Sequence, residues 1–76
     1  MYSKKPDMTI RTFEGLEELM THNEFPVLVV GVRKSRSGLG SYRHPYSCSN
    51  AAEIEMAMPR LKKMIELDGR VEVTLA

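Results

Sequence analysis

The sequence is poor in the residues that form disulfides or bind metals. It contains one cysteine, Cys48, and two histidines, His22 and His44, among 76 residues. A single cysteine cannot form an internal disulfide, and these three side chains do not have the spacing of a zinc site. The chain also lacks an apolar run long enough to span a membrane and a segment that resembles a secretory signal. These absences indicate a protein of the reducing cytoplasm that binds no metal and does not enter a membrane.

Groups that could catalyse a reaction are equally scarce. On a regular strand, His44 and Cys48 are roughly 13 Å apart, which is too far for a Cys–His pair. Cys48 precedes a predicted helix by two residues, where the helix dipole would lower its pKa, but a half-buried structural thiol is the simpler interpretation. The glycines of Gly38-Leu39-Gly40 lack the Lys-Ser/Thr pair of a phosphate-binding loop. We therefore predict a protein that is not an enzyme and uses no cofactor.

Acidic residues are missing from the middle of the chain. Residues 25–52 contain none, although the formal net charge of the whole chain is only +1. The cations of this segment are Arg33, Lys34, Arg36 and Arg43. Acids are concentrated instead in the preceding segment, at Glu14, Glu17, Glu18 and Glu24. The charge pattern predicts a basic hairpin and a separate acidic helix face.

Length and composition indicate one small folded domain. Hydrophobic residues make up 42% of the chain and charged residues 28%, which is typical of a globular protein. A chain of 76 residues can bury only a thin core. We expect residues 1–7 to form a flexible tail and residues 8–76 to form a single domain.

Two segments have the periodicity of amphipathic helices. Residues 13–20 place apolar side chains at helical spacing with acids between them, and Thr12 is suited to the N-cap. Residues 51–67 have the same periodicity, with Asn50 as the cap. The apolar stripe of this second helix consists of Ile54, Met58, Leu61 and Ile65. Pro59 lies inside the pattern and predicts a kink or a break.

The remaining segments predict an antiparallel sheet. Residues 25–32 are apolar on both faces, residues 41–48 form a return strand, and residues 70–75 alternate cleanly. Pro45 cannot donate a hydrogen bond to a neighbouring strand, so the return strand should lie at an edge. Residues 8–12 alternate too briefly to distinguish a short strand from the start of a helix.

The predicted fold class is α+β. We expect a small antiparallel sheet of three to four strands with two helices on one face, in the order (β)αββαβ. When residues 8–12 form a strand, this order is that of the ferredoxin-like split βαβ arrangement.

Two kinds of partner are compatible with the basic hairpin. In one interpretation its cations neutralise nucleic-acid phosphates while tyrosines stack on bases, although the signature of RNA-binding sheets is absent. In the other, the protein binds a protein. Because residues 25–32 are apolar on both faces, their second face needs a cover: a homodimer mate, the N-terminal segment or a target. A third interpretation needs no partner: the monomer covers both faces of the strand, and the basic hairpin is simply exposed to solvent.

We favour a non-enzymatic protein-binding module that acts as a stoichiometric inhibitor or adaptor of a larger protein or nucleoprotein complex. Small regulators of this kind are encoded by phages and mobile elements, an origin that size alone suggests. The predicted contacts are Arg33, Lys34, Arg36, Tyr42, Arg43 and Tyr46. For a basic partner, the contacts become Glu14, Glu17 and Glu18. The alternative is a nucleic-acid-binding protein that uses residues 33–46.

Overall fold

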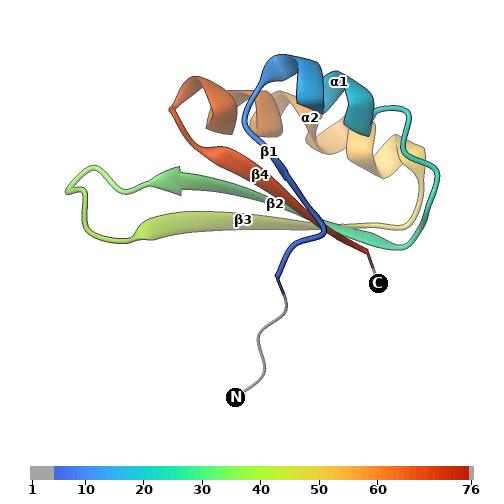
Figure 1. The fold of residues 1–76 in the computed structure, drawn as a ribbon, viewed down its shortest axis with the longest axis horizontal. Helices are drawn as coiled ribbons and strands as arrows, with labels where there is room; N and C mark the ends of the chain where they lie inside the picture. Colours follow the sequence, from blue (N-terminus) through green and yellow to red (C-terminus); the bar gives the residue numbers. More distant parts are fainter. Residues whose placement is uncertain (1–4, 76) are drawn as a thin grey trace.

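The structure, a computed structural model, describes residues 5–75 and has the element order βαββαβ. The strands form one antiparallel sheet in the order β1-β4-β2-β3, and both helices pack on the same face of it (Figure 1). The elements are β1 (Met8–Ile10), α1 (Phe13–Leu19), β2 (Val27–Lys34), β3 (Ser41–Cys48), α2 (Ala51–Glu66) and β4 (Arg70–Leu75). The predicted α+β fold with two helices on one face is confirmed.

The sheet contains two interleaved βαβ units. β1 and β2 run parallel with β4 between them, and β3 and β4 run parallel with β2 between them. This is the split arrangement expected from the element order, with the closing strand of each unit at the centre of the sheet. Residues 8–10 form the short strand that the brief alternation allowed. β3 lies at an edge, as Pro45 predicts.

The core lies between the helices and the sheet. The side chains of Val29, Val73 and Leu61 are completely buried there. α2 contributes Ile54, Ala57, Met58, Leu61 and Met64, so the predicted stripe is largely correct and Ile65 is only half-buried. In α1, Leu16 and Leu19 are buried, whereas Phe13 and Met20 at its ends are exposed.

Pro59 does not break α2. The helix runs continuously from Ala51 to Glu66. Pro59 lacks the amide that would hydrogen-bond to the carbonyl of Glu55, and both residues are exposed. Water can therefore hydrate the freed carbonyl, which explains why the predicted break is absent.

The turn between α2 and β4 packs closely against β2. Asp68 has a φ of 62°, the left-handed conformation that ends the helix. Gly69 follows, and a Cβ atom at this position would collide with the carbonyl oxygen of Val32. Only glycine fits here, so the turn fixes the start of β4 beside the end of β2.

The beginning of the domain is tied to β4. The predicted tail covers residues 1–7, of which residues 1–4 lie outside the described part of the chain. The amide of Asp7 donates to the carbonyl of Val73 at 2.8 Å, and its carboxylate accepts from the amide of Leu75 at 2.7 Å. Asp7 therefore belongs to the folded domain. Within residues 5–75, neither helix has the length and apolar character needed to cross a membrane.

Candidate functional site

The face of the sheet that points away from the helices, here called the open face, contains part of β2's apolar surface. Gly31 points toward Met64 of α2, so the residues on either side of it point the other way. Leu28, Val30 and Val32 are therefore on the open face. Leu28 is 40% exposed, but Val30 and Val32 are only 6% and 1% exposed. Something other than a helix covers the two valines.

The cover is a network of three charged side chains. Arg43 donates to one carboxylate oxygen of Glu72 at 2.6 Å, and Arg70 donates to the other at 2.8 Å. Arg43 is on β3 and Glu72 is on β4, with β2 between them, so their side chains meet above β2. Val30 pairs with Pro45 and Glu72, and Val32 pairs with Arg43 and Arg70. A partner was one of the covers predicted for the second apolar face of β2. The chain itself covers Val30 and Val32 on that face, and Leu28 stays partly exposed.

The network is ionised at neutral pH. Burial alone would raise the pKa of Glu72. The hydrogen bonds and positive charges of Arg43 and Arg70 outweigh burial, so the pKa of Glu72 lies below its ordinary value. Glu72 is therefore a charged acceptor for both arginines.

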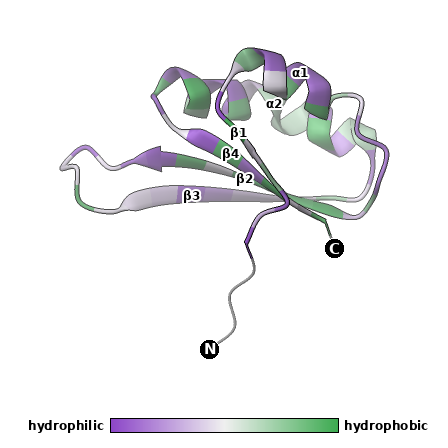
Figure 2. Ribbon diagram, in the orientation of Figure 1, coloured by the Kyte–Doolittle hydropathy of each residue, from purple (hydrophilic) through white to green (hydrophobic). Residues whose placement is uncertain are grey.

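A pocket of about 200 Å³ lies at the end of the sheet where the β2–β3 hairpin begins. We call it the hairpin-end pocket. Its charged lining consists of four cations and one acid: Arg11, Arg33, Lys34, Arg70 and Asp68. The cations come from the residue after β1 and from β2 and β4, and hydrophilic residues gather at this end of β2 and β4 (Figure 2). The fold therefore concentrates positive charge from distant parts of the sequence.

Two of these cations, Arg11 and Arg70, were not among the predicted contacts. The alternation of Arg70 with the buried Val71 and Val73 was a signal that it lies on the open face. Arg11 gave no such signal, because its position beside Arg70 depends on the pairing of β1 with β4.

The predicted hairpin contacts are divided between the two faces of the sheet. Lys34 and Arg43 lie on the open face, and Arg43 is paired with Glu72. Arg33 and Tyr42 pair across β2 and β3 on the other face, where the guanidinium lies 4.4 Å from the centre of the ring. Arg36 is exposed in the hairpin turn. The six predicted residues therefore do not form one continuous surface.

The two tyrosines of β3 are in different environments. Tyr42 is 51% exposed, although the guanidinium of Arg33 occupies one side of its ring. Tyr46 is half-buried and packs against the core. Of these two tyrosines, only Tyr42 offers a large exposed surface.

The predicted acidic residues Glu14, Glu17 and Glu18 are all exposed on α1. α1 lies in the helix layer, on the opposite side of the sheet from the open face (Figure 1). The acidic and basic surfaces anticipated from the charge pattern are thus separate in space.

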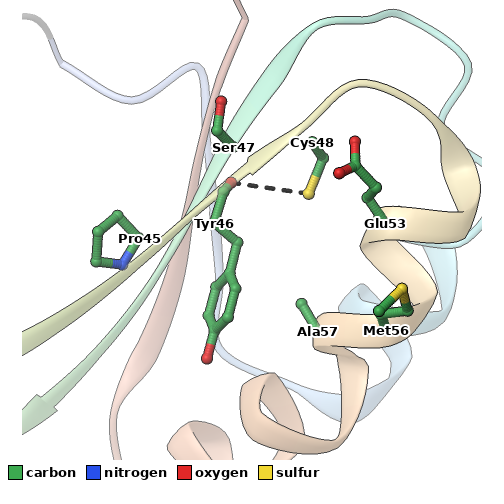
Figure 3. A pocket seen from close by; sticks show the side chains of 7 residues that line it. All are labelled: Pro45, Tyr46, Ser47, Cys48, Glu53, Met56 and Ala57. Carbon is green, nitrogen blue, oxygen red and sulfur yellow. Dashed lines mark hydrogen bonds between the residues drawn. The ribbon is translucent and has the colours of Figure 1, made fainter.

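A groove of about 400 Å³ lies between β3 and α2 (Figure 3). Tyr46, Ala57 and the exposed Met56 line it, and the Cys48 thiol donates to the Tyr46 carbonyl at 3.7 Å. Burial, and then the negative charge of Glu53, raise the pKa of Cys48. Cys48 is therefore a protonated, buried thiol at neutral pH and is not activated as a nucleophile.

The histidines do not assemble a metal site. Within residues 5–75, no three His, Cys, Asp or Glu side chains are arranged to hold a metal ion. The ring of His22 packs edge-on against Phe25 at 5.5 Å, and the Nε2 atoms of His22 and His44 are both buried without a hydrogen-bond partner in the described chain. The ring of His22 thus has a packing role, whereas His44 lies on β3 opposite Gly31.

No protein-family model, curated protein or solved structure matches this chain significantly. Its function is therefore inferred from the surfaces described above.

Proposed function

We propose that the protein is a non-enzymatic binding module that acts stoichiometrically, as an inhibitor or adaptor, by holding an acidic surface of a larger protein. The proposed contact surface, here called the basic end, consists of Arg11, Arg33, Lys34, Arg36 and Arg70. The observation that carries the proposal is the hairpin-end pocket, where four cations gather against one acid. Like charges repel one another when they are held together, so an anionic partner would be attracted to this surface.

The basic end has charge available for a partner. Arg70 shares Glu72 with Arg43. Arg11, Lys34 and Arg36, in contrast, form no ion pair with any acid of residues 5–75. Such unpaired cations mainly increase the rate of encounter and the specificity of binding.

Candidate apolar anchors for affinity lie beside the basic end, at Tyr42, and at the opposite end of β2, at Leu28. Leu28 is 40% exposed on the open face, and Tyr42 is 51% exposed beside Arg33. Tyrosine and arginine are residue types that often dominate the energy of protein interfaces. Charge and apolar surface together favour a protein partner.

Nucleic acid is the alternative partner, because phosphates would be attracted to the same cations. Recognition of unpaired bases also needs aromatic surfaces for stacking. The strand residues on the open face include no aromatic side chain, and Tyr46 is half-buried. Of the two β3 tyrosines only Tyr42 is exposed enough for stacking, which favours the protein partner.

A tagged pull-down from the native host lysate tests the proposal. It is run with and without nuclease and at two salt concentrations. We expect one protein species to be retained after nuclease treatment, with a moderate loss at high salt. Recovery that disappears with nuclease would contradict the proposal and identify nucleic acid as the partner. In that case the logarithm of affinity should fall by roughly 0.7–0.9 per logarithmic unit of salt for each phosphate contact.

A further inference from the structure

We infer that the hairpin-end pocket binds one phosphate monoester group, carried by a phosphorylated side chain of the protein partner. The identity of the carrier rests on the proposed function. The phosphate itself is inferred from the charge and the size of the pocket.

The pocket offers several free hydrogen-bond donors. Arg11 and Lys34 form no ion pair within residues 5–75. Arg70 donates to Glu72 through Nε, which leaves the donors of its two terminal nitrogens for a ligand. Ser41 also lines the pocket and adds a hydroxyl group. Hydrogen bonds from cations to phosphate oxygens are among the strong ones in proteins.

Charge distinguishes a phosphate monoester from other anions. The pocket lining holds four cations and one acid, Asp68. A monoester carries about −1.5 to −2 charges at neutral pH and three acceptor oxygens, whereas a side-chain carboxylate carries one negative charge. The pocket volume of about 200 Å³ suits a single group that enters as the end of a side chain. A phosphodiester carries one charge and continues as a chain on both sides, so it fits this site less well.

Amide chemical shifts test the pocket directly. The probe is N-acetyl-phosphoserine amide, titrated into the intact protein. The matched controls are N-acetyl-serine amide and N-acetyl-glutamate amide. We expect saturable shifts at the amides of Ser41, Gly69 and Arg70 with the phosphorylated probe and much weaker binding of both controls. Equal affinity for the glutamate probe, or no saturable shift, would overturn the inference.

Two double variants locate the binding site. Arg11→Gln/Lys34→Gln removes two pocket charges, and Lys62→Gln/Lys63→Gln removes two charges from the exposed side of α2. We expect the first to weaken phosphoserine binding by about tenfold or more and the second to leave it within about twofold. Unchanged affinity in Arg11→Gln/Lys34→Gln would overturn the assignment. Should that variant unfold, Arg11→Ala and Arg11→Lys are compared instead: the first should weaken binding and the second restore most of it.

A phosphatase arm separates this inference from the proposed function. The pull-down is repeated with lysate treated with phosphatase and with untreated lysate. A protein partner that is lost after treatment supports both proposals. A partner retained equally in both lysates overturns the phosphate inference and leaves the proposed function standing. Recovery of nucleic acid alone overturns the proposed function and its phosphoprotein carrier together.

Discussion

The two faces of the sheet are closed by different chemistry. On one face, helices α1 and α2 bury aliphatic side chains such as Leu61 and Val73. On the other face, an ion network of Arg43, Glu72 and Arg70 covers Val30 and Val32. Long charged side chains can bury apolar surface under their stems while their charged ends reach water. A strand that is apolar on both faces therefore does not require a second layer of helices or a partner chain.

The largest effect should come from the helix-covered face. Leu61 is completely buried beneath α2. Leu61→Ala should lower the free energy of unfolding by about 2–5 kcal/mol, because it removes buried methyl groups and leaves a cavity. Urea denaturation measures the loss. A change below about 1 kcal/mol would show that this face is not the main source of stability.

A smaller loss should come from the open face. Glu72→Ala leaves Arg43 and Arg70 without an acceptor and uncovers the valines of β2. We expect a loss of about 1–2 kcal/mol in urea denaturation. Glu55→Ala, at an exposed position of α2, is the control and should change stability by at most about 0.5 kcal/mol. If the two variants behave alike, the network does not stabilise the open face.

Low pH should remove the stability that the ion network of Glu72 contributes on the open face. The pKa of Glu72 lies below its ordinary value, so its contribution is fully present above the ordinary glutamate pKa of about 4.3 and is lost as the pH falls through the lowered value. The stability difference between the wild type and Glu72→Gln should therefore be constant from neutral pH to about pH 5 and shrink in stronger acid. Denaturation at a series of pH values measures it. A difference that persists unchanged in acid would contradict this role for Glu72.

The smallest effect on stability is expected for Leu28. It is 40% exposed on the open face, outside the residue pairs that the network covers. Leu28→Thr should change the free energy of unfolding by about 0.5 kcal/mol while weakening partner binding. Thermal unfolding and a binding titration with the captured partner are compared. Unchanged partner binding would remove Leu28 from the interface.

Local features of the fold follow directly from the sequence. Thr12 caps α1 by accepting from the Gly15 amide at 3.0 Å, and Asn50 caps α2 by accepting from the Glu53 amide at 3.1 Å. Both are short-range signals that residue type and spacing encode. Pro45 likewise correctly predicted that β3 lies at an edge of the sheet.

The candidate site was less predictable because it depends on strand order. Arg43 and Glu72 are 29 residues apart in the sequence. They meet only because β2 lies between β3 and β4. Arg11 joins Lys34 and Arg70 at the hairpin-end pocket because β1 pairs with β4, which in turn pairs with β2. The sequence signalled a basic hairpin, but not its neighbours on the adjacent strands.

The most direct test of the proposed function compares two charge reversals in binding the captured partner. Arg33→Glu/Lys34→Glu/Arg36→Glu reverses the hairpin side of the basic end. Arg60→Glu/Lys62→Glu/Lys63→Glu makes the same charge change on the exposed side of α2. Circular dichroism first establishes that both variants fold. We predict that the hairpin reversal weakens binding by about tenfold or more and reduces its salt dependence, while the α2 reversal has an effect of about twofold or less. Binding that survives the hairpin reversal with an unchanged salt dependence would contradict the basic end as the working surface.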